Sequence, residues 1–83
     1  MPAKSEKRNP VAIAFGDVLR AARARVGVSQ EALGLACGMD RTYVSLLERG
    51  ERQPTLSTLF ALSQQLGVAA EVLVARTGEA LSK

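Results

Sequence analysis

The stretch SQEALGLACGMDRTYVSLLERGER, residues 29–52, decides the fold of this chain. Ser29 can cap a first short helix, because its hydroxyl can accept a hydrogen bond from a free N–H in the first turn. Gly38 ends that helix, since glycine adopts without strain the positive φ that a tight turn requires. Asp40 then begins a second helix over residues 41–49, and Gly50 ends it. The stretch therefore predicts two short helices joined by one tight turn.

The apolar spacing in this stretch predicts which side of each helix is buried. Val44 and Leu47 lie three residues apart, on one side of the second helix, and attach it to the core. In the first helix Leu33 and Ala36 face inward, and Gly34 is the small residue where the second helix crosses. The free side of the second helix carries Arg41, Thr42, Tyr43, Ser45, Leu46 and Arg49. A short helix presented in this way fits the major groove of DNA, so DNA binding is our leading hypothesis.

Another helix is predicted before this stretch. Asn9 suits its N-cap, Pro10 suits its first helical position, and Gly27 ends it. An apolar stripe runs along one side of this helix, formed by Val11, Phe15, Val18, Leu19, Ala22 and Val26. Ahead of it, residues 1–9 are polar and basic without periodicity, and they predict a flexible tail.

Two more helices are predicted after the stretch, one capped by Thr55 and a fifth over residues 68–76. Their expected inward positions, numerous enough in the first of them to suggest burial on more than one side, are Leu56, Leu59, Phe60, Leu62, Leu66, Val72 and Leu73. Residues 77–83 remain as a C-terminal tail. Helices joined by such short loops predict an all-α fold, a compact five-helix bundle whose single domain covers residues 10–76.

Composition limits the classes of function. The chain has 83 residues, enough for one domain, and 47% of them are hydrophobic, so it can bury a core. It has no His and a single cysteine, Cys37, which argues against a His-based catalytic triad, a transition-metal site and an internal disulfide. It also lacks a glycine-rich phosphate loop, so we expect no enzyme activity, no cofactor and no metal.

Two further expectations come from the charge and the hydropathy. No apolar run approaches the length of a membrane span, so we expect a cytoplasmic protein without a membrane partner. The formal net charge of +3 suits a polyanionic partner, although so small an excess adds little on its own.

Residues 11–74 resemble the Xre family of helix-turn-helix regulators, which includes the Cro and cI repressors of lambdoid phages. The matching positions are Gln30, Leu33, Gly34, Gly38, Val44, Leu47, Glu48 and Gly50, followed by Pro54, Thr55, Leu56, Leu59 and the run Leu66-Gly67-Val68. The run DRTYVS at residues 40–45 is also similar to the controller proteins of restriction-modification systems, although other small Xre-type regulators share it. The family usually has alanine where this chain has Gly34.

The resemblance implies roles for the residues of the free side. The base-reading residues would be Arg41, Thr42, Ser45 and Leu46. The residues that contact phosphates or sugars would be Gln30, Tyr43, Arg49 and Arg52. Arg41 is the one suited to guanine, because its planar fork matches the O6 and N7 acceptors together. Arg23 and Glu48 would form an ion pair that ties the first helix to the end of the recognition helix.

Some residues have alternative interpretations. Leu46 could pack on a thymine methyl or lean into the core, and both placements stay open. Cys37 is more simply explained as a small buried hydrophobe than as a redox sensor. The basic side chains at 4, 7 and 8 could reach along DNA, although a solubilising tail is the simpler explanation.

Two hypotheses for the function follow. The first is a transcriptional regulator that binds a pseudo-palindromic operator in double-stranded DNA as a homodimer, joined through the fourth and fifth helices, where Val74 and Leu81 are left over. With no second domain, we expect no pocket for a small-molecule effector. The second is an antitoxin that binds a toxin protein and represses its own operon.

Overall fold

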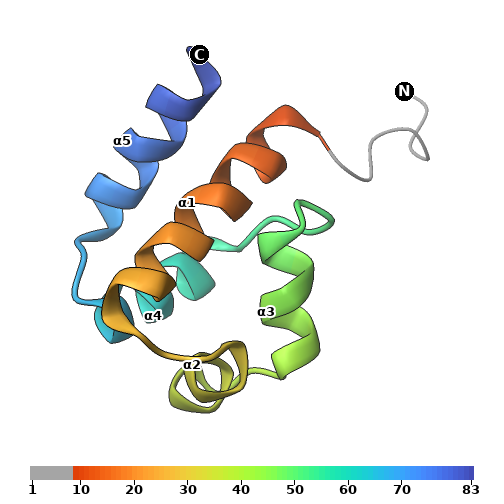
Figure 1. Cartoon of the computed structure of the whole chain (residues 1–83), viewed down its shortest axis with the longest axis vertical. Helices are drawn as coiled ribbons and strands as arrows, with labels where there is room; N and C mark the ends of the chain where they lie inside the picture. The colour runs from red at the N-terminus through yellow and green to blue at the C-terminus, as the bar shows by residue number, and fades with distance from the viewer. Residues whose placement is uncertain (1–8) are drawn as a thin grey trace.

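The computed structural model describes residues 9–83, which form five helices and no strand. The helices are α1 (Pro10–Val26), α2 (Gln30–Cys37), α3 (Arg41–Glu48), α4 (Leu56–Leu66) and α5 (Ala70–Leu81). The all-α fold predicted from the sequence is confirmed (Figure 1). The flexible tail predicted over residues 1–9 lies, apart from Asn9, outside the described residues.

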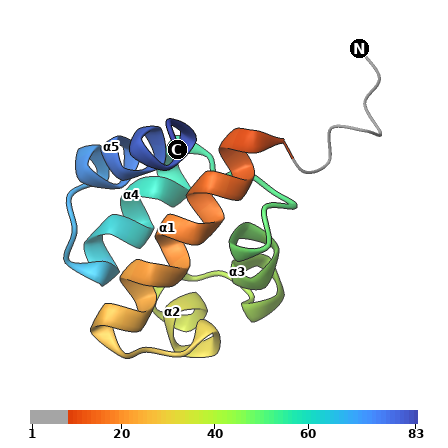
Figure 2. The same cartoon turned by 45° about the horizontal axis from the view of Figure 1, so that its top comes forward.

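α1 is the central helix of the bundle. It lies between α5 on one side and α3 on the other (Figures 1 and 2). α2 packs against α3 and α4, and α4 also contacts α1 and α5. The large side chains that are fully buried between the helices are Leu19, Leu33, Val44, Leu47, Leu62 and Leu73. Every helix contributes to this core, so the position of each helix depends on packing against the others.

Side-chain caps begin three of the helices as predicted. The Asn9 Oδ1 accepts a hydrogen bond from the Ala12 N–H at 2.8 Å, and the Ser29 Oγ accepts one from the Ala32 N–H at 3.0 Å. The Thr55 Oγ1 does the same for the first turn of α4. Asp40 occupies the N-cap position of α3, but its side chain makes no capping hydrogen bond.

The fifth helix differs from its prediction. It starts at Ala70 and continues to Leu81, so most of the predicted C-terminal tail is helical. The Thr77 hydroxyl is buried and donates a hydrogen bond to the Leu73 carbonyl at 2.8 Å. α5 packs along α1 over this length, and that packing outweighs the cost of about 1 kcal/mol for Gly78 inside the helix.

Several positions predicted to face inward are exposed instead. They are Val11, Val26, Ala36, Leu56, Phe60 and Val72. α4 is therefore buried on one side only, with Leu59, Leu62 and Leu66 inward and Phe60 59% exposed. On α5 the neighbouring Leu73 takes the inward position, and Val72 is left at the surface. Leu56, Phe60 and Val72 thus leave apolar surface on the outside of α4 and α5.

Within residues 9–83 no single helix is long and apolar enough to cross a membrane. α4 and α5 would meet that requirement only if counted together as one span, and they are bent by 103° at the break between them.

Candidate nucleic-acid interface

The turn between α2 and α3 sets the direction of α3. Gly38 has a φ of 71° and ends α2, and the Met39 N–H donates to the Gly34 carbonyl at 2.8 Å. A Cβ added at Gly34 would lie 2.7 Å from the Met39 carbonyl oxygen, so the turn packs directly on α2. The close approach at Gly34 therefore involves the turn and the start of α3 rather than the middle of that helix.

One side of α3 is anchored in the core. Val44 and Leu47 are each 0% exposed, as their spacing predicts. Tyr43 is half-buried and packs partly against the core, which leaves less of its ring free than the sequence implied. The anchoring fixes the rotation of α3 about its axis, and with it the direction of the side chains on the other side.

The free side of α3 presents the remaining predicted residues. Arg41 and Thr42 are exposed, while Ser45 and Leu46 are half-buried. Leu46 does not belong to the buried core cluster of residues 9–83, and it is not fully exposed to solvent either. It therefore lies at the edge between the free side and the anchored side.

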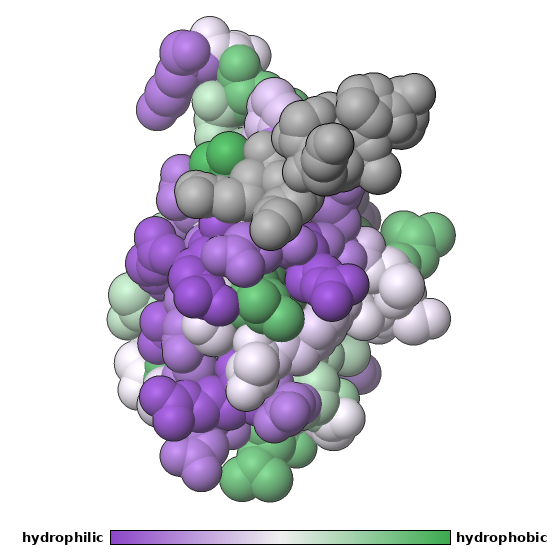
Figure 3. Space-filling view, turned by 90° about the vertical axis from the view of Figure 1, so that its right-hand side faces the viewer, coloured by the Kyte–Doolittle hydropathy of each residue, from purple (hydrophilic) through white to green (hydrophobic). Residues whose placement is uncertain are grey.

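Cationic side chains stand at both ends of α3. Arg41 is its first residue, and Arg49 and Arg52 follow its end, and all three are exposed. The Arg49 Nε lies 3.7 Å from a Glu51 carboxylate oxygen, a weak pair at a largely exposed site. Figure 3 looks at the side of the molecule on which α3 lies and shows hydrophilic residues over much of this face.

A buried carboxylate ties the end of α3 to α1 and α2. Glu48 is 3% exposed and accepts two hydrogen bonds from Arg23, at 2.6 Å from Nε and 3.0 Å from Nη2. The Gln30 amide donates to the same carboxylate at 3.0 Å. Arg20 donates to the Glu48 backbone carbonyl at 3.0 Å, and the Arg23 Nη1 donates to the Val28 carbonyl at 2.9 Å. The pair between Arg23 and Glu48 that the sequence suggested is thus one part of a larger network.

The network keeps Glu48 ionised. Burial of this carboxylate by itself would raise its pKa, but hydrogen bonds from Arg23 and Gln30, with the positive charges of Arg23 and Arg20, outweigh that effect. The net result is a pKa below the ordinary value for glutamate. The hydrogen bond to Glu48 raises the pKa of the Arg23 guanidinium in turn, so both groups are charged at neutral pH.

Gln30 connects the start of α2 with the end of α3. It is the first residue of α2, and its side chain is half-buried and hydrogen-bonded to Glu48. An amide nitrogen carries two hydrogens, so the hydrogen bond to Glu48 leaves one for another acceptor. The contact orients the Gln30 side chain and links the start of α2 to the end of α3.

Two contributors to this site were missed from the sequence. Arg20 precedes Arg23 by three residues, so both lie on one face of α1, and this spacing is the signal that could have identified Arg20. Gly16 lies where α1 crosses the end of α3, and a Cβ there would be 2.5 Å from the Glu48 carbonyl oxygen. A single glycine inside an amphipathic helix is the signal for such a close approach.

Cys37 joins α2 to α4 and lies away from these groups. It is half-buried, and its Sγ lies 3.6 Å from the Ala61 carbonyl oxygen. Burial raises the pKa of the thiol. In the part of the chain that the structure describes, no three His, Cys, Asp or Glu side chains are arranged to hold a metal ion.

The sequence matches a known family over most of its folded part. The family described as Helix-turn-helix (HTH_3) matches residues 19–73, which include α2, the turn and α3. The chain is 44% identical over 57 residues to the HTH-type transcriptional regulator y4dJ of Sinorhizobium fredii, covering 69% of this chain and 74% of that protein. It is 38% identical over 61 residues to the control protein C.BamHI of Bacillus amyloliquefaciens, covering 72% of this chain and 75% of that protein.

Solved structures show the same fold. The clp gene regulator ClgR from Corynebacterium glutamicum has a TM-score of 0.83 at 26% identity, over 87% of this chain and 77% of that one. The restriction-modification controller protein C.AhdI from Aeromonas hydrophila has a TM-score of 0.72 at 37% identity, over 75% of this chain and 94% of that one.

Proposed function

The chain belongs to the helix-turn-helix family HTH_3, and on that premise we propose that it is a transcriptional regulator of the controller-protein type that binds a pseudo-palindromic DNA operator as a homodimer. One observation carries this proposal. The side chains of Val44 and Leu47 are completely buried while those of Arg41 and Thr42, on the same helix, are exposed. A short helix held in this way can enter a major groove about 12 Å wide without unpacking from its own domain.

Base reading falls to the exposed side of α3. Arg41 stands at the N-terminal end of the helix, where recognition helices meet base edges, and can donate two hydrogen bonds to guanine. Thr42 and Ser45 can reach further edges through their hydroxyls. Leu46 lies at the edge of this side and outside the core cluster of the described residues, and it would contact a thymine methyl.

Contacts with the phosphates of the DNA backbone would fix the register of α3 on the duplex. Arg49 and Arg52 are exposed beyond the end of α3, and Gln30 stands at the start of α2 with one amide hydrogen left over. The Tyr43 hydroxyl would reach a phosphate or sugar from the edge of the core. Cations, amides and hydroxyls at these positions suit phosphate oxygens, which position a protein without reading sequence.

The homodimer would form through α4 and α5. Leu56 and Phe60 on α4, and Val74 and Leu81 on α5, are large apolar side chains that the single chain leaves exposed. A symmetric contact that covers such residues would present two copies of α3 to one face of the duplex. Half-sites about 34 Å apart, one helical turn, would then match the symmetry of the protein.

The proposal is tested by DNA binding with and without the reading residue. The duplex upstream of the gene and a scrambled duplex of equal length are titrated at several salt concentrations. We expect tighter binding to the upstream duplex and a steep loss of affinity with salt. Arg41→Ala should cost about 1–3 kcal/mol on the upstream duplex, and Arg52→Ala should weaken both duplexes alike. Equal affinity of the wild type for the two duplexes would contradict specific recognition.

A further inference from the structure

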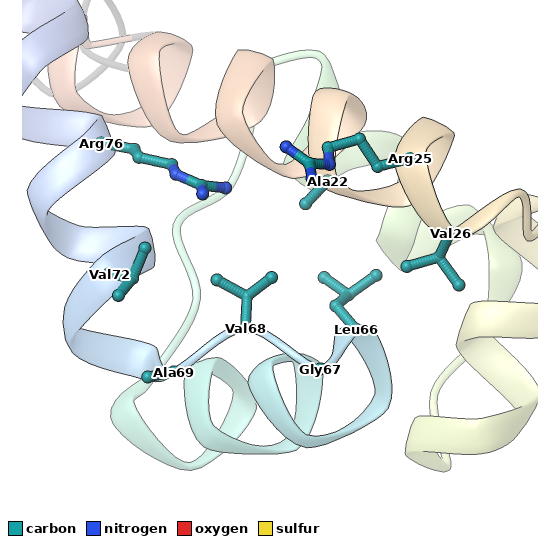
Figure 4. A pocket seen from close by; sticks show the side chains of 9 residues that line it. All are labelled: Ala22, Arg25, Val26, Leu66, Gly67, Val68, Ala69, Val72 and Arg76. Carbon is teal, nitrogen blue, oxygen red and sulfur yellow. The ribbon is translucent and has the colours of Figure 1, made fainter.

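A groove on the far side of α1 from α3 combines apolar walls with two arginines. Its volume is about 490 Å³, and it lies between the end of α1, the turn that joins α4 to α5, and the first half of α5. The apolar side chains that line it are Val68 and Val72, with Val26 at the end of α1 and Leu66, which is itself only 4% exposed (Figure 4). The sequence led us to expect no pocket for a small-molecule effector, yet this groove lies between helices of the described bundle.

The two arginines of the groove come from different helices. Arg25 belongs to the last turn of α1 and Arg76 to α5, and Figure 4 shows their guanidinium groups reaching toward one another over Val68. Among residues 9–83 neither forms an ion pair with a carboxylate, whereas Arg20, Arg23 and Arg49 each do. Two like charges held over an apolar surface repel each other, and an anion between them would turn that repulsion into attraction.

We propose that this groove binds a small organic carboxylate that has an apolar body. The carboxylate would lie between Arg25 and Arg76, because guanidinium groups match its two oxygens with paired N–H donors. The apolar body would cover Val68 and Val72, which are otherwise in contact with water. The volume falls within the range of about 300–1,000 Å³ that small-molecule sites occupy.

Other occupants fit the groove less well. A bare inorganic anion would satisfy the arginines but leave the apolar walls in water. DNA held by α3 would not reach the groove, because α1 lies between α3 and α5 in both views of the fold (Figures 1 and 2).

The groove is also separate from the surface assigned to the homodimer. Val72 and Arg76 are four residues apart and share one face of α5, while Val74 and Leu81 are seven apart and share another. A step of two residues turns a helix by about 200°, so the two faces point in nearly opposite directions. A bound carboxylate would therefore be compatible with both the dimer and the DNA complex, and its binding can be measured without either.

The experiment is a titration of the full chain, followed by ¹⁵N–¹H spectra, with sodium octanoate as the probe. Octanamide serves as the neutral analogue and inorganic phosphate as the anion without an apolar body. We expect saturable shifts centred on residues 66–72, with a Kd of about 0.1–1 mM for a ligand of about ten non-hydrogen atoms. Arg25→Ala and Arg76→Ala should each weaken octanoate about tenfold. Lys83→Ala removes the same charge from the exposed C-terminus and should leave the affinity unchanged.

Several other results of this titration would contradict the proposal. Shifts that do not saturate would overturn the binding site itself. Shifts that saturate equally with octanamide would overturn the role of the arginines. Equal binding of phosphate would overturn the role of the apolar walls and leave an anion site only. A loss in Lys83→Ala as large as in Arg76→Ala would show an unspecific charge effect, which also contradicts the proposal. None of these readouts depends on DNA binding, so failure here and failure of the proposed function are distinguishable.

Discussion

Replacement of Glu48 by alanine tests whether the network at the end of α3 holds the interface together. The side chain of Glu48 is 1% exposed and that of its partner Arg23 is 19% exposed, so Glu48→Ala leaves a guanidinium largely buried without its counter-charge. Removal of one member of a buried pair costs about 3–5 kcal/mol. Arg23 keeps its hydrogen bond to the Val28 carbonyl and some contact with water, so we expect the lower end, about 3 kcal/mol.

The assay is urea unfolding followed by circular dichroism, with Asp17→Ala as the matched control. Asp17 also pairs with an arginine, at 3.6 Å, but its side chain is 66% exposed. Loss of such a surface pair should cost less than about 1 kcal/mol. The midpoint of Glu48→Ala should fall without a change in slope, which would show lower stability rather than a different denatured state.

A double variant separates the pair from its surroundings. If the cost of Glu48→Ala comes from the stranded guanidinium, then Arg23→Ala combined with Glu48→Ala should be no less stable than Glu48→Ala alone. The reasoning is refuted if Glu48→Ala and Asp17→Ala differ by less than about 1 kcal/mol, since a buried pair would then be worth no more than an exposed one.

Three further outcomes are expected. The pKa of Glu48 is lower in the folded chain, so its contribution to stability is complete above the pKa of an unfolded glutamate and is lost as the pH falls below that value toward the folded pKa. The urea midpoint of the wild type should therefore fall more steeply in acid than the midpoint of Glu48→Gln. Parallel curves of midpoint against pH would contradict this. Gly16→Ala should destabilise the fold by about 1–3 kcal/mol, because the added Cβ meets backbone oxygens of α3. Gly78→Ala, whose Cβ meets nothing within 4 Å, should stabilise the fold by about 0.5–1 kcal/mol. Thermal unfolding measures both, and a change in stability of the same sign for the two variants would contradict the prediction. Thr55→Ala should cost about 1 kcal/mol through the lost cap of α4, again by thermal unfolding, and no change in midpoint would show that the cap is not needed.

Local signals predicted the parts of the fold that depend on neighbours in sequence. Ser29 and Thr55 cap their helices, and Gly38 makes the turn, because each acts within three residues of itself. Val44 and Leu47 were placed correctly by spacing alone, since positions three apart on a helix share a side.

Contacts between distant segments were harder to predict. Gly16 and Arg20 meet the end of α3 across about thirty residues of chain, and no periodicity within α1 shows what will pack there. The end of α5 was misplaced because packing on α1 overrides the weak local signal of Gly78. Phe60 was misplaced because apolar type alone does not distinguish a core position from an exposed one.

The central claim, that α3 reads DNA sequence, is tested most directly by selection of binding sites from random duplexes with the wild type and with Arg41→Ala. We expect the wild type to enrich a pseudo-palindrome with half-sites one helical turn apart and a guanine preference at one position of each half. Arg41→Ala should enrich the same pattern with that single preference lost. A wild-type pool without any enriched pattern, or an Arg41→Ala pool that keeps every preference, would contradict the claim.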